Sequence, residues 1–480
     1  MKTDLSIMCV RFENFRNYAT LELTNLSRLV IIVGDNALGK TNIIEGIQLV
    51  SMVDSFRKPP WNDVVRKESD HAHVAIEFQL KGCKNHLYLD VRENKRFYQL
   101  NEKAKSVRDL FGLLPAVLFT PNDLQIIQGP AERRRLGIDD FGCQLSRSFV
   151  DIRQDYTRVI KQKNALLREE KVDFDTLASW NRNLVKLGSS LMAHRSALFE
   201  RVMEKASVVY HHIAPAEQLT AAYMPSWLLI SDPEGNFSDS SDDKEYKGFG
   251  ASAAGGKEEG REEVGGREAG KEEADRGEAK GEGAKEGEIG EREAQRGETK
   301  REESKRVGQK ERLAEMLTAM LERHQAQEIR QGRSLVGPHR DEIIFFINGN
   351  DVRRFGSQGQ QRSVALALKI AEVEILRELI GADPILLLDD VMSEIDEGRR
   401  KMLLDLIDTT TQTFITTTNL GYFDDKTLQQ AQIIRLPLQE NMQETPRAQI
   451  EQATQPMSQP EIDSPQTTQA TSQPEQTTQP

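Results

Sequence analysis

A short stretch near the start of the chain has the residue types and spacing of a phosphate-binding loop. A glycine is followed, after four residues, by glycine, lysine and threonine. In this pattern the glycines let backbone N–H groups surround phosphate oxygens, the lysine reaches the β- and γ-phosphates, and the threonine hydroxyl is a ligand of Mg²⁺. The sequence therefore predicts a nucleotide site formed by Gly34, Asp35, Asn36, Ala37, Leu38, Gly39, Lys40 and Thr41.

The residues on either side of this loop have the patterns that the motif requires. The apolar run 29–33 is rich in β-branched residues and predicts a buried strand. Ile43, Ile47 and Val50 follow the loop at helical spacing, so the predicted order is strand, loop, helix. A chance glycine-rich turn before a helix is the alternative, and the two flanking patterns argue against it.

A second group of chemically useful residues ends another strand. The apolar run 384–388 leads directly into Asp389 and Asp390. In a P-loop fold the first carboxylate holds Mg²⁺, directly or through water, and the second orients or deprotonates the attacking water. We therefore expect Lys40, Asp389 and Asp390 to be catalytic, and Thr41 and Asp389 to bind the metal. An apolar strand that ends in aspartate is common, so this prediction depends on the P-loop.

A third motif opens a predicted helix about thirty residues before the aspartate pair. A serine and glycines at a helix N-terminus form an anion site. The order and spacing resemble the signature motif of ABC-type ATPases, which contacts the γ-phosphate of nucleotide held by a partner's P-loop. We expect the same role for Ser357, Gln358, Gly359 and Gln360. An ordinary helix with a serine cap remains the alternative.

These motifs predict how the chain assembles and how fast it hydrolyses ATP. One P-loop and one signature per chain predict that two copies close head to tail around ATP, with two-fold symmetry. ATP would then close the clamp and hydrolysis would open it. Two residues depart from the wider ABC class: Thr418 stands where many members have histidine, and Asp390 where most have glutamate. The shorter reach of Asp390 suggests slow hydrolysis.

The net charge of −12 comes from two segments of unusual composition. Residues 232–310 contain 23 acidic and 16 basic residues, a net of −7, and residues 437–480 contain 6 and 1, a net of −5. The rest of the chain is neutral, so the acidic total does not exclude a nucleic-acid partner. Gly/Glu/Lys/Arg repeats in the first segment and Gln/Thr/Pro in the second predict disorder, because neither can bury enough apolar surface.

The cysteines and the apolar runs indicate in which cellular compartment we expect the protein. Cys9, Cys83 and Cys143 are odd in number and have no metal-type spacing, which favours reduced thiols in a cytosolic protein. The N-terminus lacks the apolar region of a signal peptide, and no run of about eighteen apolar residues occurs. We expect a cytoplasmic protein that does not bind membranes.

The fold class expected from these patterns is α/β, an ABC-type P-loop ATPase head with an added antiparallel sheet and an inserted helical subdomain. Alternating residues predict paired strands in 7–23 and a hairpin in 74–91, while 138–212 is helical in pattern. The expected organisation is given by five ranges: the first part of the head (1–125), a helical arm (126–231), the charged insertion (232–310), the return of arm and head (311–436) and the tail (437–480).

Several motifs together resemble the RecF family of bacterial DNA-repair ATPases. They cover about 1–230 and 311–436, and the Gly-Pro-His-Arg-Asp segment and the Ser-Gln-Gly-Gln-Gln-Arg form of the signature are specific to that family. In that family the Asp-Asp pair and the threonine-rich strand 413–418 are usual. The motifs are 14–18, the P-loop with Asn42, 120–124, 133–135, 337–342, 357–362, 388–391 and 393–396.

The resemblance implies an ATP-dependent dimer that binds single-stranded, gapped or junction DNA. It also implies a slow, DNA-stimulated ATPase that works with RecO and RecR to load RecA, in replication-fork maintenance and the SOS response. The competing classes are the nucleotide-binding subunit of a transporter and a binding module without turnover. The helical insertion before the signature argues against the first, and the intact catalytic residues argue against the second.

Candidate DNA contacts are basic residues near the start of the helical arm and after the P-loop helix. A run of arginines can bind the phosphate backbone, although such runs are also often solvated or paired within the protein. The candidates are Arg133, Arg134, Arg135, Arg57 and Lys58.

Overall fold

The computed structural model describes most of the chain outside the two segments of unusual composition. The described residues are 5–53, 55, 57, 59–123, 126–229, 308–381, 383–407 and 411–437. Residues 232–307 of the predicted insertion, residues 438–480 of the predicted tail, and Lys58 lie outside them. Composition places residues 308–310 in the insertion, but in the structure they belong to a helix that continues to 331.

A five-stranded sheet carries the nucleotide motifs. Its order is β14-β3-β13-β12-β8, and every neighbouring pair is parallel. All residues of β3 and β12 are buried, as the apolar runs 29–33 and 385–388 predict, and the burial extends to Asp389. Parallel strands end at one edge of a sheet, so the loops after β3, β12 and β13 meet there. The strands are β3 (Leu29–Val33), β8 (Ala116–Phe119), β12 (Ile385–Asp389), β13 (Thr413–Thr417) and β14 (Gln432–Arg435).

A six-stranded antiparallel sheet lies beside it, in the order β2-β1-β4-β5-β6-β7. The two predicted strand pairs are confirmed as β1–β2 and β4–β5. Helix α1 contacts β1 and β4 of this sheet and β12 and β13 of the parallel sheet, so it lies between them. The elements are β1 (Leu5–Phe15), β2 (Tyr18–Thr24), α1 (Lys40–Ser51), β4 (His71–Leu80), β5 (Cys83–Arg92), β6 (Lys95–Leu100), β7 (Lys103–Lys105) and α2 (Val107–Leu110).

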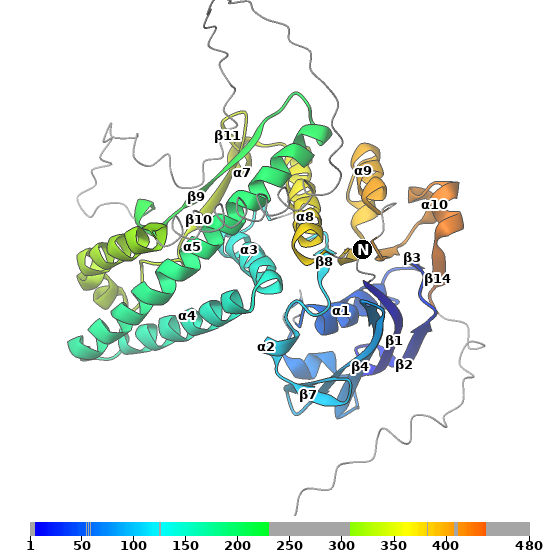
Figure 1. Ribbon diagram of the computed structural model, residues 1–480, viewed down its shortest axis with the longest axis horizontal. Helices are drawn as coiled ribbons and strands as arrows, with labels where there is room; N and C mark the ends of the chain where they lie inside the picture. Colours follow the sequence, from blue (N-terminus) through cyan, green and yellow to red (C-terminus); the bar gives the residue numbers. More distant parts are fainter. Residues whose placement is uncertain are drawn as a thin grey trace, which may run out of the picture. The chain divides into compact units, whose positions relative to one another are not determined.

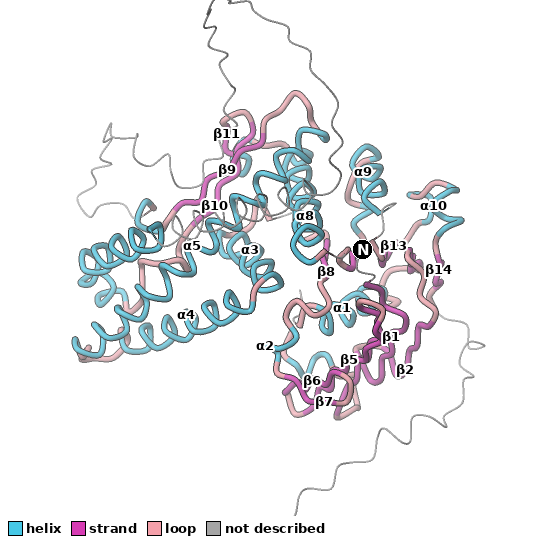
Figure 2. Tube along the Cα trace, in the orientation of Figure 1, coloured by secondary structure: helices cyan, strands magenta, loops and turns pink. Residues whose placement is uncertain are grey.

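In the described residues, the predicted helical arm contains the helices α3, α4 and α5, and the return of the chain adds the helix at 308–331, a small sheet, α7 and α8. Helix α5 packs against both α4 and α8 (Figure 1). Strands β11, β10 and β9 form a three-stranded sheet, drawn in magenta among these helices in Figure 2. The elements are α3 (Ala131–Leu145), α4 (Arg147–Leu166), α5 (Phe174–Ile213), β9 (Leu219–Met224), β10 (Glu342–Ile347), β11 (Asn350–Asp351), α7 (Val352–Phe355) and α8 (Gln358–Ile380).

Helices α9 (Glu397–Ile407) and α10 (Asp425–Gln430) follow the aspartate pair and the threonine-rich strand, respectively. Short 3₁₀ turns occur along the described chain at η1 (Trp61–Val64), η3 (Ser226–Leu228), η5 (Val391–Ser393) and η6 (Leu420–Tyr422). None of the helices in the described residues is both long and apolar enough to cross a membrane.

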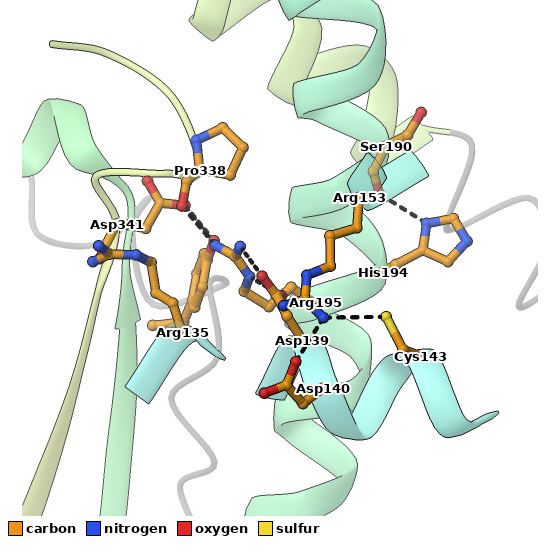
Figure 3. A network of polar contacts seen from close by, with 11 residues as sticks. Arg135, Asp139, Asp140, Cys143, Arg153, Ser190, His194, Arg195, Pro338 and Asp341 are labelled. Carbon is orange, nitrogen blue, oxygen red and sulfur yellow. Dashed lines mark hydrogen bonds and ion pairs between the residues drawn. The ribbon is translucent and has the colours of Figure 1, made fainter. Parts of the chain in front are cut away.

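A buried ion pair joins the helices of the arm to the Gly-Pro-His-Arg-Asp segment (Figure 3). Arg195 of α5 donates two hydrogen bonds of 2.9 Å to the carboxylate of Asp139 on α3, and a third of 2.7 Å to the carbonyl oxygen of Pro338. Both charged side chains are buried. Removal of one partner from such a pair typically costs about 3–5 kcal/mol, so the network fixes how these elements pack.

The histidine of the same segment has a structural environment. His339 Nδ1 lies 2.7 Å from the hydroxyl of Tyr156 on α4, and its Nε2 lies 3.4 Å from the carbonyl oxygen of Ser334. Burial, with a smaller contribution from the positive charge of Arg340, lowers the pKa of His339 to about 3. The folded protein therefore keeps this imidazole neutral at physiological pH.

This lowered pKa predicts a pH dependence of stability. The unfolded chain has a histidine pKa near 6.5, so it takes up a proton before the folded chain does and stability is lost as the pH falls below that value. Between pH 7 and pH 5 the wild type should lose about 2 kcal/mol more unfolding free energy than His339→Gln. Denaturant unfolding of both proteins at each pH measures the difference, and parallel pH profiles would contradict the assignment.

Candidate active site

The P-loop depends on a glycine and on the turn between β1 and β2. Gly39 caps α1 with φ of 97°, in the left-handed region. A Cβ at this position would lie 2.5 Å from Asn17 Nδ2 and 2.8 Å from the Tyr18 hydroxyl oxygen. Both side chains also donate to the carbonyl oxygen of Leu38, at 3.3 and 3.4 Å. The turn therefore holds the loop in shape, and only glycine fits at its end.

The P-loop lysine is folded back into the loop that precedes it. Lys40 is only 6% exposed, and its Nζ donates to the carbonyl oxygens of Gly34 and Asp35, each at 2.8 Å. Its positive charge thus lies over the loop whose backbone N–H groups can bind anions. Phosphate oxygens can replace the two carbonyl acceptors, so the arrangement fits a nucleotide.

The first aspartate ends β12 within a shell of hydroxyls and cations. Asp389 is 5% exposed and accepts a 2.8 Å hydrogen bond from Thr416 Oγ1. Burial raises the pKa of its carboxyl, while hydrogen bonds from Thr416 and Thr41 and the positive charges of Arg57 and Lys40 oppose that shift. The structure therefore brings Thr41, Lys40 and Asp389 together, which is the donor set that Mg²⁺ and phosphate require.

The second aspartate has an oxygen that is available for a further partner. Asp390 adopts the left-handed conformation, with φ of 52°. Its Oδ1 is buried and has no hydrogen-bond partner among the described residues. Burial raises the pKa of this carboxyl, the positive charge of Lys40 lowers it, and the negative charge of Asp389 raises it. An orphaned carboxylate oxygen beside the P-loop lysine fits a group that receives a proton from a bound water.

Thr416 is a site residue that the sequence analysis missed. It pairs with Asp389 in the parallel register of β12 and β13. Its hydroxyl donates to Asp389 and accepts from the backbone N–H of Asp390 at 3.0 Å, so one side chain positions both aspartates. The sequence directed attention to Thr418, which is exposed just beyond the strand. No local sequence pattern distinguishes Thr416 from its neighbours, because the register of β12 and β13 selects it.

The side chain of Arg57 lies beside the P-loop helix. Its Nη1 donates to Asn42 Oδ1 at 2.8 Å and to Glu45 Oε2 at 2.9 Å. Glu45 is fully buried, and it also receives two hydrogen bonds from the guanidinium of Arg16. The carboxylate thus joins the β1–β2 turn to the segment after α1. This position connects Arg57 with the nucleotide site.

The three consecutive arginines of α3 do not share one environment. Arg134 is 3% exposed, and its guanidinium is used by both carboxylate oxygens of Glu342 and by three backbone carbonyls. Arg135 is half-buried and donates to the carbonyl oxygen of Asp341. Arg133 is exposed. The prediction of a DNA contact is thus wrong for Arg134, because its hydrogen-bond donors are engaged inside the protein.

The predicted signature begins α8 at the protein surface. Ser357 caps the helix, since its Oγ accepts from the Gln360 N–H at 3.1 Å and its own N–H donates to Gln360 Oε1 at 2.8 Å. Ser357 and Gln358 are exposed. Within the described part of the chain, no hydrogen bond joins this motif to the P-loop. The hydrogen bonds of the signature instead go to Glu217 and Arg399, outside the P-loop.

The sequence and the fold are similar to those of known proteins. Residues 6–444 match the model of the family described as RecF/RecN/SMC N terminal domain. The DNA replication and repair protein RecF of Lachnoclostridium phytofermentans is 31% identical over 437 residues, which cover 90% of this chain and 97% of that protein. RecF of Acaryochloris marina is 30% identical over 429 residues, with 88% and 94% covered.

Solved structures agree with these sequence similarities. The recombination mediator protein RecF-ATPrS in the RecFOR pathway matches with a TM-score of 0.67 and 25% identity, covering 88% of this chain and 94% of that one. The corresponding RecF-ATP structure has a TM-score of 0.65 with the same identity and coverage. The predicted fold class, an ABC-type head with an antiparallel sheet and a helical insertion, is confirmed. This chain belongs to the RecF family of DNA replication and repair proteins.

Proposed function

We propose that the chain is an ATP-dependent DNA clamp of recombinational repair, in which ATP closes a dimer and hydrolysis opens it. The observation that carries this proposal is the convergence of Lys40, Thr41 and the aspartate pair at one edge of the parallel sheet. The relatives named as DNA replication and repair proteins, and the similar structures described with ATP and ATPrS, support the same nucleotide and pathway.

Each residue of the site has a distinct role in this proposal. The backbone of 34–41 and the ammonium of Lys40 bind the phosphates. Thr41 and Asp389 would hold Mg²⁺, which would supply positive charge to the phosphate oxygens. Asp390 orients the attacking water and takes its proton, because its free Oδ1 lies in the field of Lys40. Because the aspartate side chain is shorter than that of the glutamate in most ABC ATPases, we expect slow ATP hydrolysis.

A second copy of the chain completes the site. Each copy carries one P-loop, and its exposed signature at Ser357 presents a helix N-terminus to an anion outside the chain. Phe355, two residues earlier, is 73% exposed, an unusual environment for a large apolar side chain. A head-to-tail dimer would cover Phe355 and place each Ser357 on the other copy's nucleotide, with two-fold symmetry.

The finer parts of the proposal concern DNA and protein partners. The clamp binds single-stranded DNA and gapped or junction DNA, and this binding stimulates its ATPase activity. Together with RecO and RecR it loads RecA in the cytoplasm, which supports replication forks and the SOS response. The family membership and the RecFOR description of the similar structures support these roles. Arg133 is the DNA contact best supported, because it is exposed at the start of α3.

Two substitutions separate closure of the clamp from its opening. Lys40→Met should abolish ATP-dependent dimerisation, because it removes the cation that binds the phosphates. Asp390→Asn should permit dimerisation but slow hydrolysis by about 100-fold or more, the usual effect of losing a general base. Sedimentation with and without ATP, and ATPase rates with and without gapped DNA, measure both effects. A wild type that dimerises without ATP, or not at all, would rule out the clamp.

Thr416→Val tests the residue that positions the aspartate pair. Valine keeps the shape of threonine but can neither donate to Asp389 nor accept from the Asp390 N–H. We expect a roughly 10-fold fall in the hydrolysis rate, equivalent to about one hydrogen bond. The affinity for ATP should change much less, because the P-loop is intact. Thr24→Val, at an exposed threonine of β2 outside the site, is the control and should hydrolyse ATP at the wild-type rate.

Arg133→Ala tests the proposed DNA contact. Loss of one phosphate contact should weaken binding to gapped DNA similarly for all sequences and reduce the slope of log affinity against log salt by about 1. Arg133→Lys retains the charge and should keep most of that slope. Fluorescence anisotropy over a series of salt concentrations gives both slopes, and an unchanged slope in Arg133→Ala would show that DNA lies elsewhere.

A further inference from the structure

We propose that Glu217 is a positioning residue that sets the signature of one chain for the nucleotide bound by a second copy. The proposal rests on the head-to-tail dimer proposed above. It assigns a role to a residue outside the P-loop, the aspartate pair and the signature. Glu217 lies in the short connection between α5 and β9, close to the first turn of α8.

Glu217 connects helices α5 and α8 through hydrogen bonds to its two carboxylate oxygens. Its Oε1 accepts a 2.9 Å hydrogen bond from Gln360 Nε2 on α8, and its Oε2 accepts a 2.5 Å hydrogen bond from the Tyr210 hydroxyl in the last turn of α5. Tyr210 is fully buried, so its end of the bridge is fixed by packing. Each carboxylate oxygen therefore has a donor from a different helix.

The carboxylate also decides which way the Gln360 amide faces. A carboxylate only accepts hydrogen bonds, so the NH₂ group of Gln360 must point to Glu217. The carbonyl oxygen of the same amide is then directed at the backbone N–H of Ser357, which it accepts at 2.8 Å. With no acceptor at position 217 the amide could turn, and the reciprocal cap that holds Ser357 would lose one of its two hydrogen bonds.

A second contact fixes the same turn of α8 from the other direction. Arg399 of α9 donates from Nη2 to the carbonyl oxygen of Gly359 and from Nε to Ser363 Oγ, both at 2.8 Å. Helix α9 follows the aspartate pair through η5. The signature is thus held on one side by the arm, through Glu217, and on the other by the segment after the catalytic aspartates.

These contacts lead to a specific functional expectation. Glu217 contacts the signature, and no hydrogen bond in the described residues connects it to the P-loop of its own chain. Its loss should leave ATP binding to the isolated chain unchanged. It should impair the nucleotide site whose P-loop belongs to the other copy. The defect of a Glu217 variant should therefore appear in trans.

The first measurement compares single variants. Glu217→Ala should bind ATP with wild-type affinity, but its ATPase rate and its ATP-dependent dimerisation should fall by about 10-fold, the effect of one charge-assisted hydrogen bond. Glu217→Gln retains an acceptor and should recover much of the rate. Tyr210→Phe, which removes only the second donor, should have a smaller defect of the same kind. Glu204→Ala, an exposed glutamate of α5, is the matched control and should match the wild type.

The second measurement asks in which chain Glu217 acts. Glu217→Ala chains are mixed with Asp390→Asn chains, and ATP hydrolysis is compared with that of each variant alone. In the mixed dimer, one site combines the intact P-loop and aspartates of the first chain with the intact signature of the second. We expect its rate to approach half that of the wild-type dimer.

The outcomes of the two measurements separate the hypotheses. If wild-type chains dimerise with ATP but the mixture shows no rate above the average of its parents, Glu217 does not act through the signature and the inference is overturned. Weaker ATP binding by the isolated Glu217→Ala chain would overturn it as well. Failure of the wild type itself to dimerise with ATP would instead overturn the proposed function.

Discussion

The parallel pairing of β13 between β3 and β12 is the constraint on which the site depends. It places the P-loop after one neighbouring strand and the aspartate pair after the other. In this register the hydroxyl of Thr416 donates a hydrogen bond to Asp389 and accepts one from the backbone N–H of Asp390. Two carboxylates at the end of an apolar strand repel one another and lose hydration, so they need fixed donors and nearby cations. Thr416 and Thr41 supply donors to Asp389, and Lys40 supplies a positive charge.

The same logic applies at the first turn of α8. An exposed serine at the start of a helix is a common feature and by itself has no orientation toward a ligand. Here Gln360, Glu217 and Arg399 hold the first turn of α8 against the arm and against α9. The protein thus fixes two surfaces that no hydrogen bond joins within the described residues of one chain. Two separately fixed surfaces are what the proposed dimer requires, because each surface would then bind nucleotide together with another copy.

The sequence was informative where local pattern determines structure. Apolar runs predicted β3 and β12, alternation predicted β1–β2 and β4–β5, and motif spacing predicted the loop around Lys40. It was less informative where distant residues meet. The register that selects Thr416 over Thr418 and the burial of Arg134 against Glu342 depend on pairings across tens or hundreds of residues. A run of three arginines looks uniform in the sequence, whereas helical geometry turns each one toward a different environment.

The position of β13 in the chain also has a consequence for biosynthesis. β3 ends at residue 33, whereas the strand that separates it from β12 begins at residue 413. Contacts between such distant segments form slowly, because a long loop must close first. A ribosome therefore releases most of the chain before the phosphate loop and the aspartates can be assembled side by side. The phosphate loop and the aspartates can therefore come together only after the chain has been synthesised beyond residue 417.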